Sequence, residues 1–120
     1  MAAGVNNNPF EYADFVTAST SKTLRGPRAG LIFGKSQYKS KIDQSIFPGI
    51  LGAPQPSLYP GLAVALKYCK TPEYRIFAEK CIDNSRALCE GMDFYGYRAL
   101  TGGSDTNIMV AVTQHTGVNA

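Results

Sequence analysis

The sequence lacks several features on which common classes of protein depend. No hydrophobic run approaches the roughly 18 apolar residues that a membrane helix needs, and residues 1–8 show no basic segment followed by an apolar core, so neither a membrane span nor a secretory signal is expected. The single histidine, His115, argues against a zinc site. The cysteines, Cys69, Cys81 and Cys89, are odd in number and form no C-x-x-C pair. We therefore expect buried free thiols in a reducing compartment.

Charge is also sparse, with 18% charged residues and a net charge of +3 over 120 residues. The hydrophobic content of 44% is typical of one small folded domain. The densest basic cluster consists of Lys35, Lys39 and Lys41, interrupted by Tyr38. Because no aromatic stacking pattern lies beside it, we interpret this cluster as a solvated helix or loop face. Neither nucleic acid nor a membrane is expected as a partner.

The apolar patterning predicts a mixed α/β chain. The expected elements are strands at 14–17 and 31–33 (the second one buried), helices at 35–46, 58–69 and 72–91, a loop at 47–57, two further strands at 97–100 and 108–112, and a frayed tail at 113–120. The helix at 58–69 is expected to be buried on more than one side because its apolar surface is almost continuous.

The helix at 72–91 has the clearest local signals. Thr71 is a suitable N-cap, Pro72 suits the first helical position, and Gly91 or Gly96 is expected to end the helix. Cys81 and Cys89 lie eight residues apart on this helix, so neither is a natural disulfide partner of the other. We interpret its apolar stripe as a packing surface, formed by Tyr74, Phe77, Ala78, Cys81, Ile82, Ser85, Leu88, Cys89 and Met92.

The chemistry of the chain is concentrated around one lysine. The first predicted strand leads into a row of hydroxyl residues that Lys22 closes, and a turn with Arg25 and Arg28 follows. A lysine can form a Schiff base with an aldehyde, more readily when desolvation or nearby positive charge lowers its pKa. Hydroxyl groups and arginines suit a phosphate-bearing aldehyde such as pyridoxal phosphate. On spacing alone, a solvated surface lysine is the commoner explanation.

A resemblance to a known family changes this balance. Residues 16–30 read V-T-A-S-T-S-K-T-L-R-G-P-R-A-G and resemble V-T-T-T-T-H-K-T-L-R-G-P-R-G-G, the active-site signature of serine hydroxymethyltransferase (glycine hydroxymethyltransferase). The chain is identified as a member of that family, whole or in part. Further blocks similar to the family follow the same order, at 2–5, 9–11, 46–49, 52–54, 63–67, 96–97 and 101–105.

The resemblance implies the site and the reaction. Lys22 would carry pyridoxal phosphate as a Schiff base, and the reaction would move the serine hydroxymethyl carbon to tetrahydrofolate and leave glycine. The partners would be serine or glycine, folate, and further copies in a homodimer or homotetramer, in the cytoplasm or the mitochondrial matrix. The residues implied to bind cofactor are Ser19, Thr20, Ser21, Arg28, Gly52 and Ala53, the last two at the cofactor phosphate of a neighbouring subunit.

The implied architecture is α/β, part of a fold-type I pyridoxal-phosphate transferase similar to aspartate aminotransferase. Residues 1–70 would belong to the large cofactor-binding domain, 71–92 would form a connecting helix, and 93–120 would begin the small domain. Much apolar surface would then be uncovered if the chain stood alone.

Four residues differ from the family pattern and leave the implied site with fewer polar groups. Ser21 and Gln55 stand where the family has histidine, Ala18 where it has threonine, and Ala53 where it has glycine. The family aspartate and histidine that contact the cofactor ring would precede residue 1, and the arginine for the substrate carboxylate would follow residue 120. We therefore expect a segment that is inactive alone. Two alternatives stay open: a truncated, non-catalytic paralogue that serves as a structural or interaction subunit, and, with less support, a phosphate- or RNA-binding module.

Overall fold

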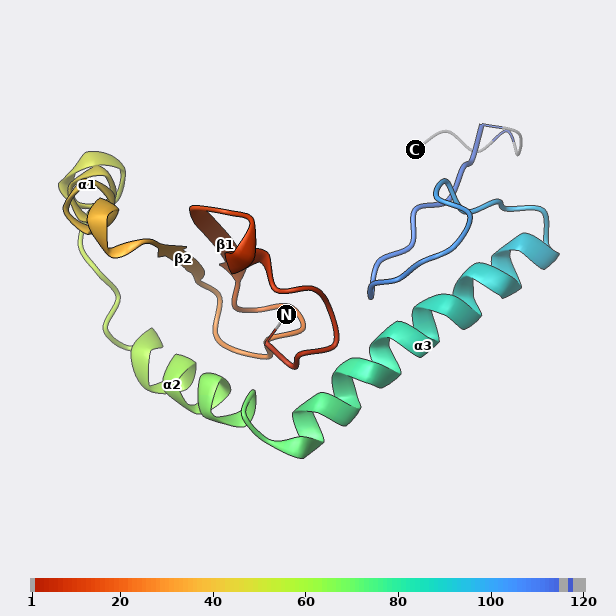
Figure 1. Ribbon diagram of the computed structural model, residues 1–120, viewed down its shortest axis with the longest axis horizontal. Coiled ribbons are helices and arrows are strands. Elements are labelled where there is room, and N and C mark those ends of the chain that lie inside the picture. Colours follow the sequence, from red (N-terminus) through yellow and green to blue (C-terminus); the bar gives the residue numbers. More distant parts are fainter. Residues whose placement is uncertain (1, 115–116, 118–120) are drawn as a thin grey trace. The chain divides into compact units, whose positions relative to one another are not determined.

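The computed structural model describes residues 2–114 and residue 117 (Figure 1). The chain divides into two compact units, one up to residue 71 and the other from residue 72 onward. Within the described residues, no helix is long and apolar enough to cross a membrane. The single histidine, His115, lies outside the described residues.

The first unit is built on one antiparallel hairpin. Strand β1 spans Phe15–Ser19 and strand β2 spans Gly30–Gly34, so both strands predicted from the sequence are confirmed, with β1 ending two residues later than expected. They pair as a two-stranded sheet in a register that joins Phe15 to Gly34, Val16 to Phe33, Thr17 to Ile32, Ala18 to Leu31 and Ser19 to Gly30.

The expectation that the second strand is buried is wrong. Ile32 is 50% exposed and Phe33 is 36% exposed. A two-stranded ribbon leaves both of its faces open unless other elements cover them, and here the cover is sparse. One of the contacts comes from the turn η1 (Pro9–Glu11), whose Phe10 ring meets Phe33 edge-on with the ring centroids 5.5 Å apart.

The segment after β2 consists of short helical pieces where the sequence predicts a helix at 35–46. A turn, η2 (Ser36–Tyr38), leads into helix α1 (Lys39–Gln44), whose exposed basic residues agree with the expected solvated face. The segment η3 (Ser45–Ile50) follows and overlaps the start of the predicted loop at 47–57. Phe47 and Pro48 have non-helical backbone angles inside η3. The remainder, residues 51–57, is irregular and exposed as expected.

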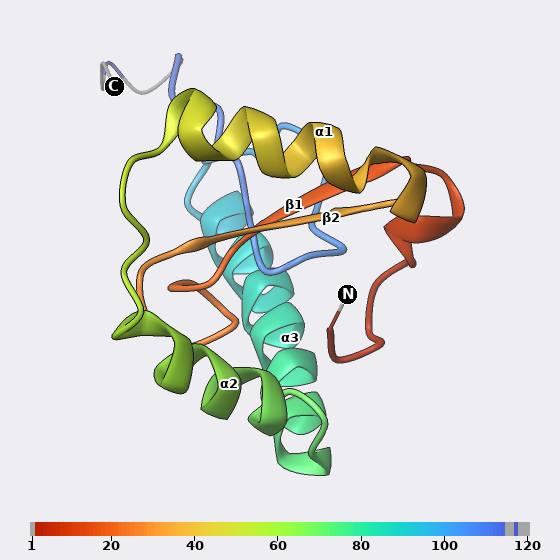
Figure 2. The same ribbon diagram turned by 90° about the vertical axis from the view of Figure 1, so that its left-hand side faces the viewer.

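Helix α2 spans Leu58–Tyr68 and confirms the helix predicted at 58–69. The expectation that it is buried on more than one side is wrong, because Ala65 is its only buried residue and Val64 is 70% exposed. Within the first unit, Figure 2 shows α1 on one side of the hairpin and α2 on the other. The helix therefore packs through a single narrow stripe, which lies at the turn between the strands.

The second unit contains the long helix α3 (Pro72–Phe94), which confirms the predicted helix and extends it by three residues. Gly91 lies within the helix, and the chain leaves it at Gly96, whose φ of +84° is the left-handed conformation that often follows a helix end. The Tyr97 N–H donates to the carbonyl of Met92 at 2.8 Å. All members of the predicted apolar stripe are buried or half-buried except Leu88, which is 55% exposed.

The two strands expected after α3 are reduced to one antiparallel bridge between Ala99 and Ala111. The Leu100 N–H donates to the carbonyl of Val110 at 2.8 Å, and the Val112 N–H donates to that of Arg98 at 2.9 Å. The segments thus meet where the sequence predicts, but they do not form extended strands. Of the expected frayed tail at 113–120, residues 115–116 and 118–120 lie outside the described residues.

Candidate functional site

The connection between β1 and β2, residues 20–29, carries the candidate lysine and is called the lysine turn below. Its base is closed by main-chain hydrogen bonds. The Thr20 N–H donates to the carbonyl of Ala29 at 3.0 Å, and the Gly26 N–H donates to the carbonyl of Thr20 at 2.8 Å. The hairpin ladder therefore continues one step past the strands before the chain turns away.

The Thr20 side chain adds hydrogen bonds to the main chain at the base of the same turn. It is 0% exposed, and its hydroxyl accepts the Ala29 N–H at 2.8 Å. The hydroxyl oxygen also lies 2.5 Å from the Pro27 carbonyl and 2.7 Å from the Ala29 carbonyl. A hydroxyl has a single proton, so it donates to one of these carbonyls at a time. The structure thus places Thr20, predicted from the resemblance to bind cofactor, with its hydroxyl engaged by the main chain.

Lys22 lies at the open side of the lysine turn and is exposed. Its carbonyl accepts the Arg25 N–H at 2.9 Å, which closes a four-residue turn around it. Among the described residues, its amine takes part in no ion pair or hydrogen bond. Ser21 and Arg28 of the same connection are also exposed, as is Ser19 at the end of β1.

Arg25 behaves differently from Arg28 because its side chain turns toward α2. Its guanidinium carbon lies 5.7 Å from the centroid of the Tyr68 ring, and its Nη1 lies 3.5 Å from the Tyr68 hydroxyl. The Arg25 backbone has a φ of +60°, in the left-handed region. Sequence reasoning missed this contact, since 43 positions separate the two residues and no local pattern links them.

Helix α2 packs against the lysine turn through Gly61, Ala65 and Tyr68. These three residues are called the α2 seat below. These residues follow at intervals of four and three, so they share one helix face. A Cβ built on Gly26 would lie 3.3 Å from the Ala65 Cβ, and one built on Gly61 would lie 3.4 Å from the Pro27 ring. The close approach of Gly26 explains why Ala65 is the buried residue of α2.

The comparison with known families agrees with this geometry. The family model described as SHMT, serine hydroxymethyltransferase, matches residues 1–120, which includes the lysine turn and the α2 seat. The chain belongs to the serine hydroxymethyltransferase family. At the level of the family, this means pyridoxal-phosphate-dependent interconversion of serine and glycine with folate, generally in oligomers.

Two residues that the family resemblance assigns to the cofactor lie elsewhere on the chain. Gly52 and Ala53 are exposed and belong to the irregular segment between η3 and α2. A Cβ on Gly52 would meet nothing within 4 Å, and its φ is not positive. Within the described part of the chain, no hydrogen bond joins either residue to the lysine turn. Thr20, Ser21 and Arg28 lie on the lysine turn and Ser19 ends β1 beside it, whereas Gly52 and Ala53 lie on a different segment.

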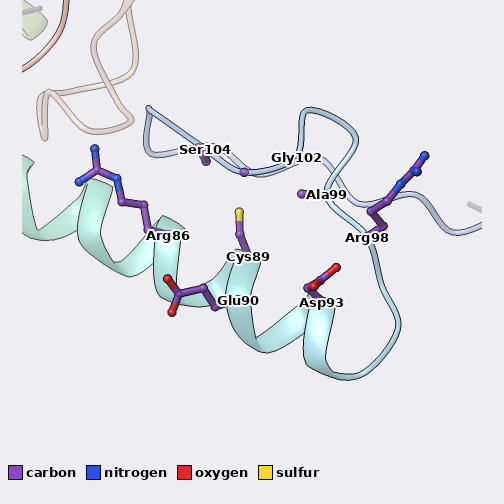
Figure 3. Close-up of a pocket in the computed structure, with 9 residues that line it drawn as sticks. Arg86, Cys89, Glu90, Asp93, Arg98, Ala99, Gly102 and Ser104 are labelled. Carbon is purple, nitrogen blue, oxygen red and sulfur yellow. The ribbon is translucent and has the colours of Figure 1, made fainter.

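The second unit of this family member contains a cavity of about 300 Å³ between the end of α3 and the turn that follows Ala99 (Figure 3). The buried Cys89 thiol points from α3 toward the turn that carries Gly102 and Ser104. None of the predicted site residues lines the cavity. In the described residues, the cysteines are free thiols, of which only Cys89 is fully buried, and no three metal-ligating side chains gather.

Proposed function

We propose that this chain supplies the cofactor-binding lysine of a pyridoxal-phosphate-dependent serine hydroxymethyltransferase, and that Lys22 is that lysine. The observation that carries the proposal is an exposed amine held on a turn whose base is fastened by a fully buried threonine. Exposed hydroxyls of Ser19 and Ser21 and the exposed Arg28 guanidinium make a donor set that fits a phosphate-bearing aldehyde.

When bound, pyridoxal phosphate supplies an aldehyde that condenses with an amine, with loss of water, and a ring that accepts electrons from the substrate α-carbon. The residues of the chain hold and orient this group. Lys22 contributes the amine, Arg28 balances negative charge, and the hydroxyls of Ser19 and Ser21 donate hydrogen bonds. Thr20 supports the cofactor site from beneath, because its hydroxyl fixes the main chain on both sides of Lys22.

The wider architecture is proposed on the same grounds. Residues 1–70 would form part of the large domain of a fold-type I pyridoxal-phosphate transferase, 71–92 a connecting helix, and 93–120 the start of the small domain. In a homodimer or homotetramer, Gly52 and Ala53 would face the cofactor phosphate of a neighbouring subunit. The open space around Gly52 supports this arrangement, since a neighbouring subunit could approach the backbone closely there.

Binding of pyridoxal phosphate to variants of the 120-residue chain tests the proposal. We expect Lys22→Met to abolish the saturable covalent capture of the cofactor and Arg28→Met to weaken binding about tenfold, the usual effect of losing a charged hydrogen bond. Lys67→Met, which removes an exposed lysine of α2, is the matched control and should leave both unchanged. Equal capture by the Lys22→Met and Lys67→Met variants would refute the proposal. We expect no glycine formation from serine and tetrahydrofolate by the chain alone, and rapid formation would contradict that part.

A second function has support from the surface of the first unit. Phe47, Ile50 and Leu51 are 58%, 82% and 59% exposed, and such apolar groups favour burial against further polypeptide. A non-catalytic structural or interaction subunit would use this surface without binding cofactor. Sedimentation of the chain discriminates: an assembly that captures no cofactor favours this function, whereas a monodisperse monomer contradicts it.

A further inference from the structure

Arg25 has an unusual backbone conformation for its residue type. Among the described residues, it is the only one other than glycine with a positive φ, at +60°. A side chain with a Cβ is disfavoured in the left-handed region because the Cβ crowds the following carbonyl oxygen. Such a conformation persists only where the surroundings hold it, and conformations of this kind gather at functional sites.

Two sets of contacts hold Arg25 in place. On the main-chain side, its N–H donates to the carbonyl of Lys22 at 2.9 Å, and the next N–H, of Gly26, donates to Thr20 at 2.8 Å. On the side-chain side, the guanidinium lies over the Tyr68 ring and reaches the Tyr68 hydroxyl at 3.5 Å. Arg25 therefore links the main chain at Lys22 to a fixed point on α2.

Tyr68 is well placed to be that fixed point. It is half-buried, and it follows Gly61 and Ala65 on the α2 seat. These two residues pack against Pro27 and Gly26, so the register of α2 against the lysine turn is set independently of Arg25. The Tyr68 ring is thus presented to Arg25 by a helix that the rest of the turn already anchors.

We propose that Tyr68 is a positioning residue for Lys22, acting through Arg25. The inference rests on the proposed function of Lys22 as the cofactor lysine. The aromatic ring holds the guanidinium, the held side chain keeps Arg25 in the left-handed region, and that conformation keeps the Arg25 N–H on the Lys22 carbonyl. Without the ring, Arg25 relaxes, the four-residue turn opens, and the Lys22 amine is presented in many orientations, of which few suit capture of an aldehyde.

Capture of pyridoxal phosphate by Lys22 measures this effect without turnover. The chain is incubated with pyridoxal phosphate for set times, reduced with borohydride, and the adduct on the Lys22 peptide is quantified by mass spectrometry. We expect Tyr68→Leu to slow capture roughly three- to fivefold, the size of an exposed cation–π contact expressed as a rate. Tyr68→Phe keeps the ring and should stay within about twofold of the unaltered chain. The control is Tyr59→Leu, which removes an exposed tyrosine of the same helix and should change nothing.

A second background separates positioning from a general loss of structure. Glycine adopts a positive φ without cost, so Arg25→Gly removes the need for Tyr68. In the Arg25→Gly background, Tyr68→Leu should therefore slow capture no further. If the loss persists in that background, Tyr68 acts on general stability and the proposal is overturned.

The remaining outcomes are also decisive. Equal capture rates for the unaltered chain and Tyr68→Leu overturn this inference and leave the proposed function intact. Absence of any adduct on Lys22 in the unaltered chain overturns the proposed function, and the positioning role falls with it. Exchange of the Arg25 amide hydrogen, followed by NMR, should accelerate in Tyr68→Leu by a similar factor, and unchanged exchange would also contradict the proposal.

Discussion

The Thr20 hydroxyl accepts a hydrogen bond from the backbone N–H of Ala29 at 2.8 Å, across nine positions of sequence. The same oxygen lies within hydrogen-bonding distance of the Pro27 and Ala29 carbonyls. One buried side chain thus serves main-chain groups on the far side of the lysine turn. This small network begins two residues before Lys22.

Replacing Thr20 by valine keeps the shape of the side chain and removes its hydroxyl. The Ala29 N–H and a neighbouring carbonyl then lose a buried partner, so we expect the free energy of unfolding to fall by about 1–3 kcal/mol. Urea denaturation measures the loss. Thr17→Val, at an exposed position of β1, is the matched control and should change stability by less than about 0.5 kcal/mol. Similar stability of the two variants would show that the Thr20 network contributes nothing.

Gly26 is predicted to tolerate no side chain. A Cβ there would lie 3.2 Å from the Thr20 carbonyl oxygen and 3.3 Å from the Ala65 Cβ, and neither atom can move without shifting main chain. We expect Gly26→Ala to lower the free energy of unfolding by about 1–3 kcal/mol, as overpacked sites do. Gly30→Ala, where a Cβ would meet nothing within 4 Å, serves as the comparison and should be close to neutral. If both variants unfold at the same urea concentration, the lysine turn does not pack against α2 at Gly26.

Helix α3 offers a substitution in the stabilising direction. Gly91 lies inside the helix, is exposed, and leaves open space for a Cβ. We expect Gly91→Ala to raise stability by about 0.5–1 kcal/mol because alanine loses less backbone entropy on folding. Gly96→Ala should instead lower it by about 1–2 kcal/mol, because a φ of +84° is unfavourable for alanine. Thermal unfolding followed by circular dichroism measures both stability changes. Changes of the same sign in the two variants would contradict the assigned helix end.

The ion pair between Lys35 and Asp14 is expected to make the stability of the folded state depend on pH. The hydrogen bond that the Lys35 amine donates to the Asp14 carboxylate, and then the negative charge of that carboxylate, raise the pKa of the Lys35 amine above the ordinary lysine value. A raised pKa means that the pair stabilises the folded state below the pKa of the unfolded amine, and that this contribution is lost as the pH rises through the folded pKa. Both side chains are exposed, so salt should weaken the effect.

NMR titration of the Lys35 amine checks the direction. We expect Asp14→Asn to bring the pKa back to the ordinary lysine value, and added salt to move it the same way. A pKa for Lys35 that does not respond to Asp14→Asn would mean that the ion pair does not persist in solution.

Local signals were enough to predict most of the regular elements. The helix predicted at 72–91 follows from its 3.6-residue stripe and its proline start, and the two strands follow from short apolar runs, but these runs do not indicate the antiparallel pairing of the strands. Burial was harder to predict, because it depends on which elements cover a surface. Leu88, Val64 and Ile32 look like core residues in the sequence, yet they are more than 45% exposed.

In the candidate site too, some features follow from the sequence and others depend on contacts between distant segments. The family signature points to Lys22, and the structure places Thr20, Ser21 and Arg28 on the same connection, with Ser19 at the end of β1. Sequence reasoning could not foresee that Thr20 is fully buried or that Arg25 reaches Tyr68, because both facts depend on contacts between distant segments. The resemblance identifies residue types, whereas the backbone determines which polar atoms are available to a ligand.

The measurement that tests the account most directly is peptide mass mapping after the 120-residue chain has been incubated with pyridoxal phosphate and reduced with borohydride. We expect one saturable adduct that maps to Lys22, with slower and non-saturable labelling of exposed lysines such as Lys67 and Lys70. Labelling spread evenly over the lysines, or no adduct on Lys22, would contradict the assignment of Lys22 as the cofactor lysine.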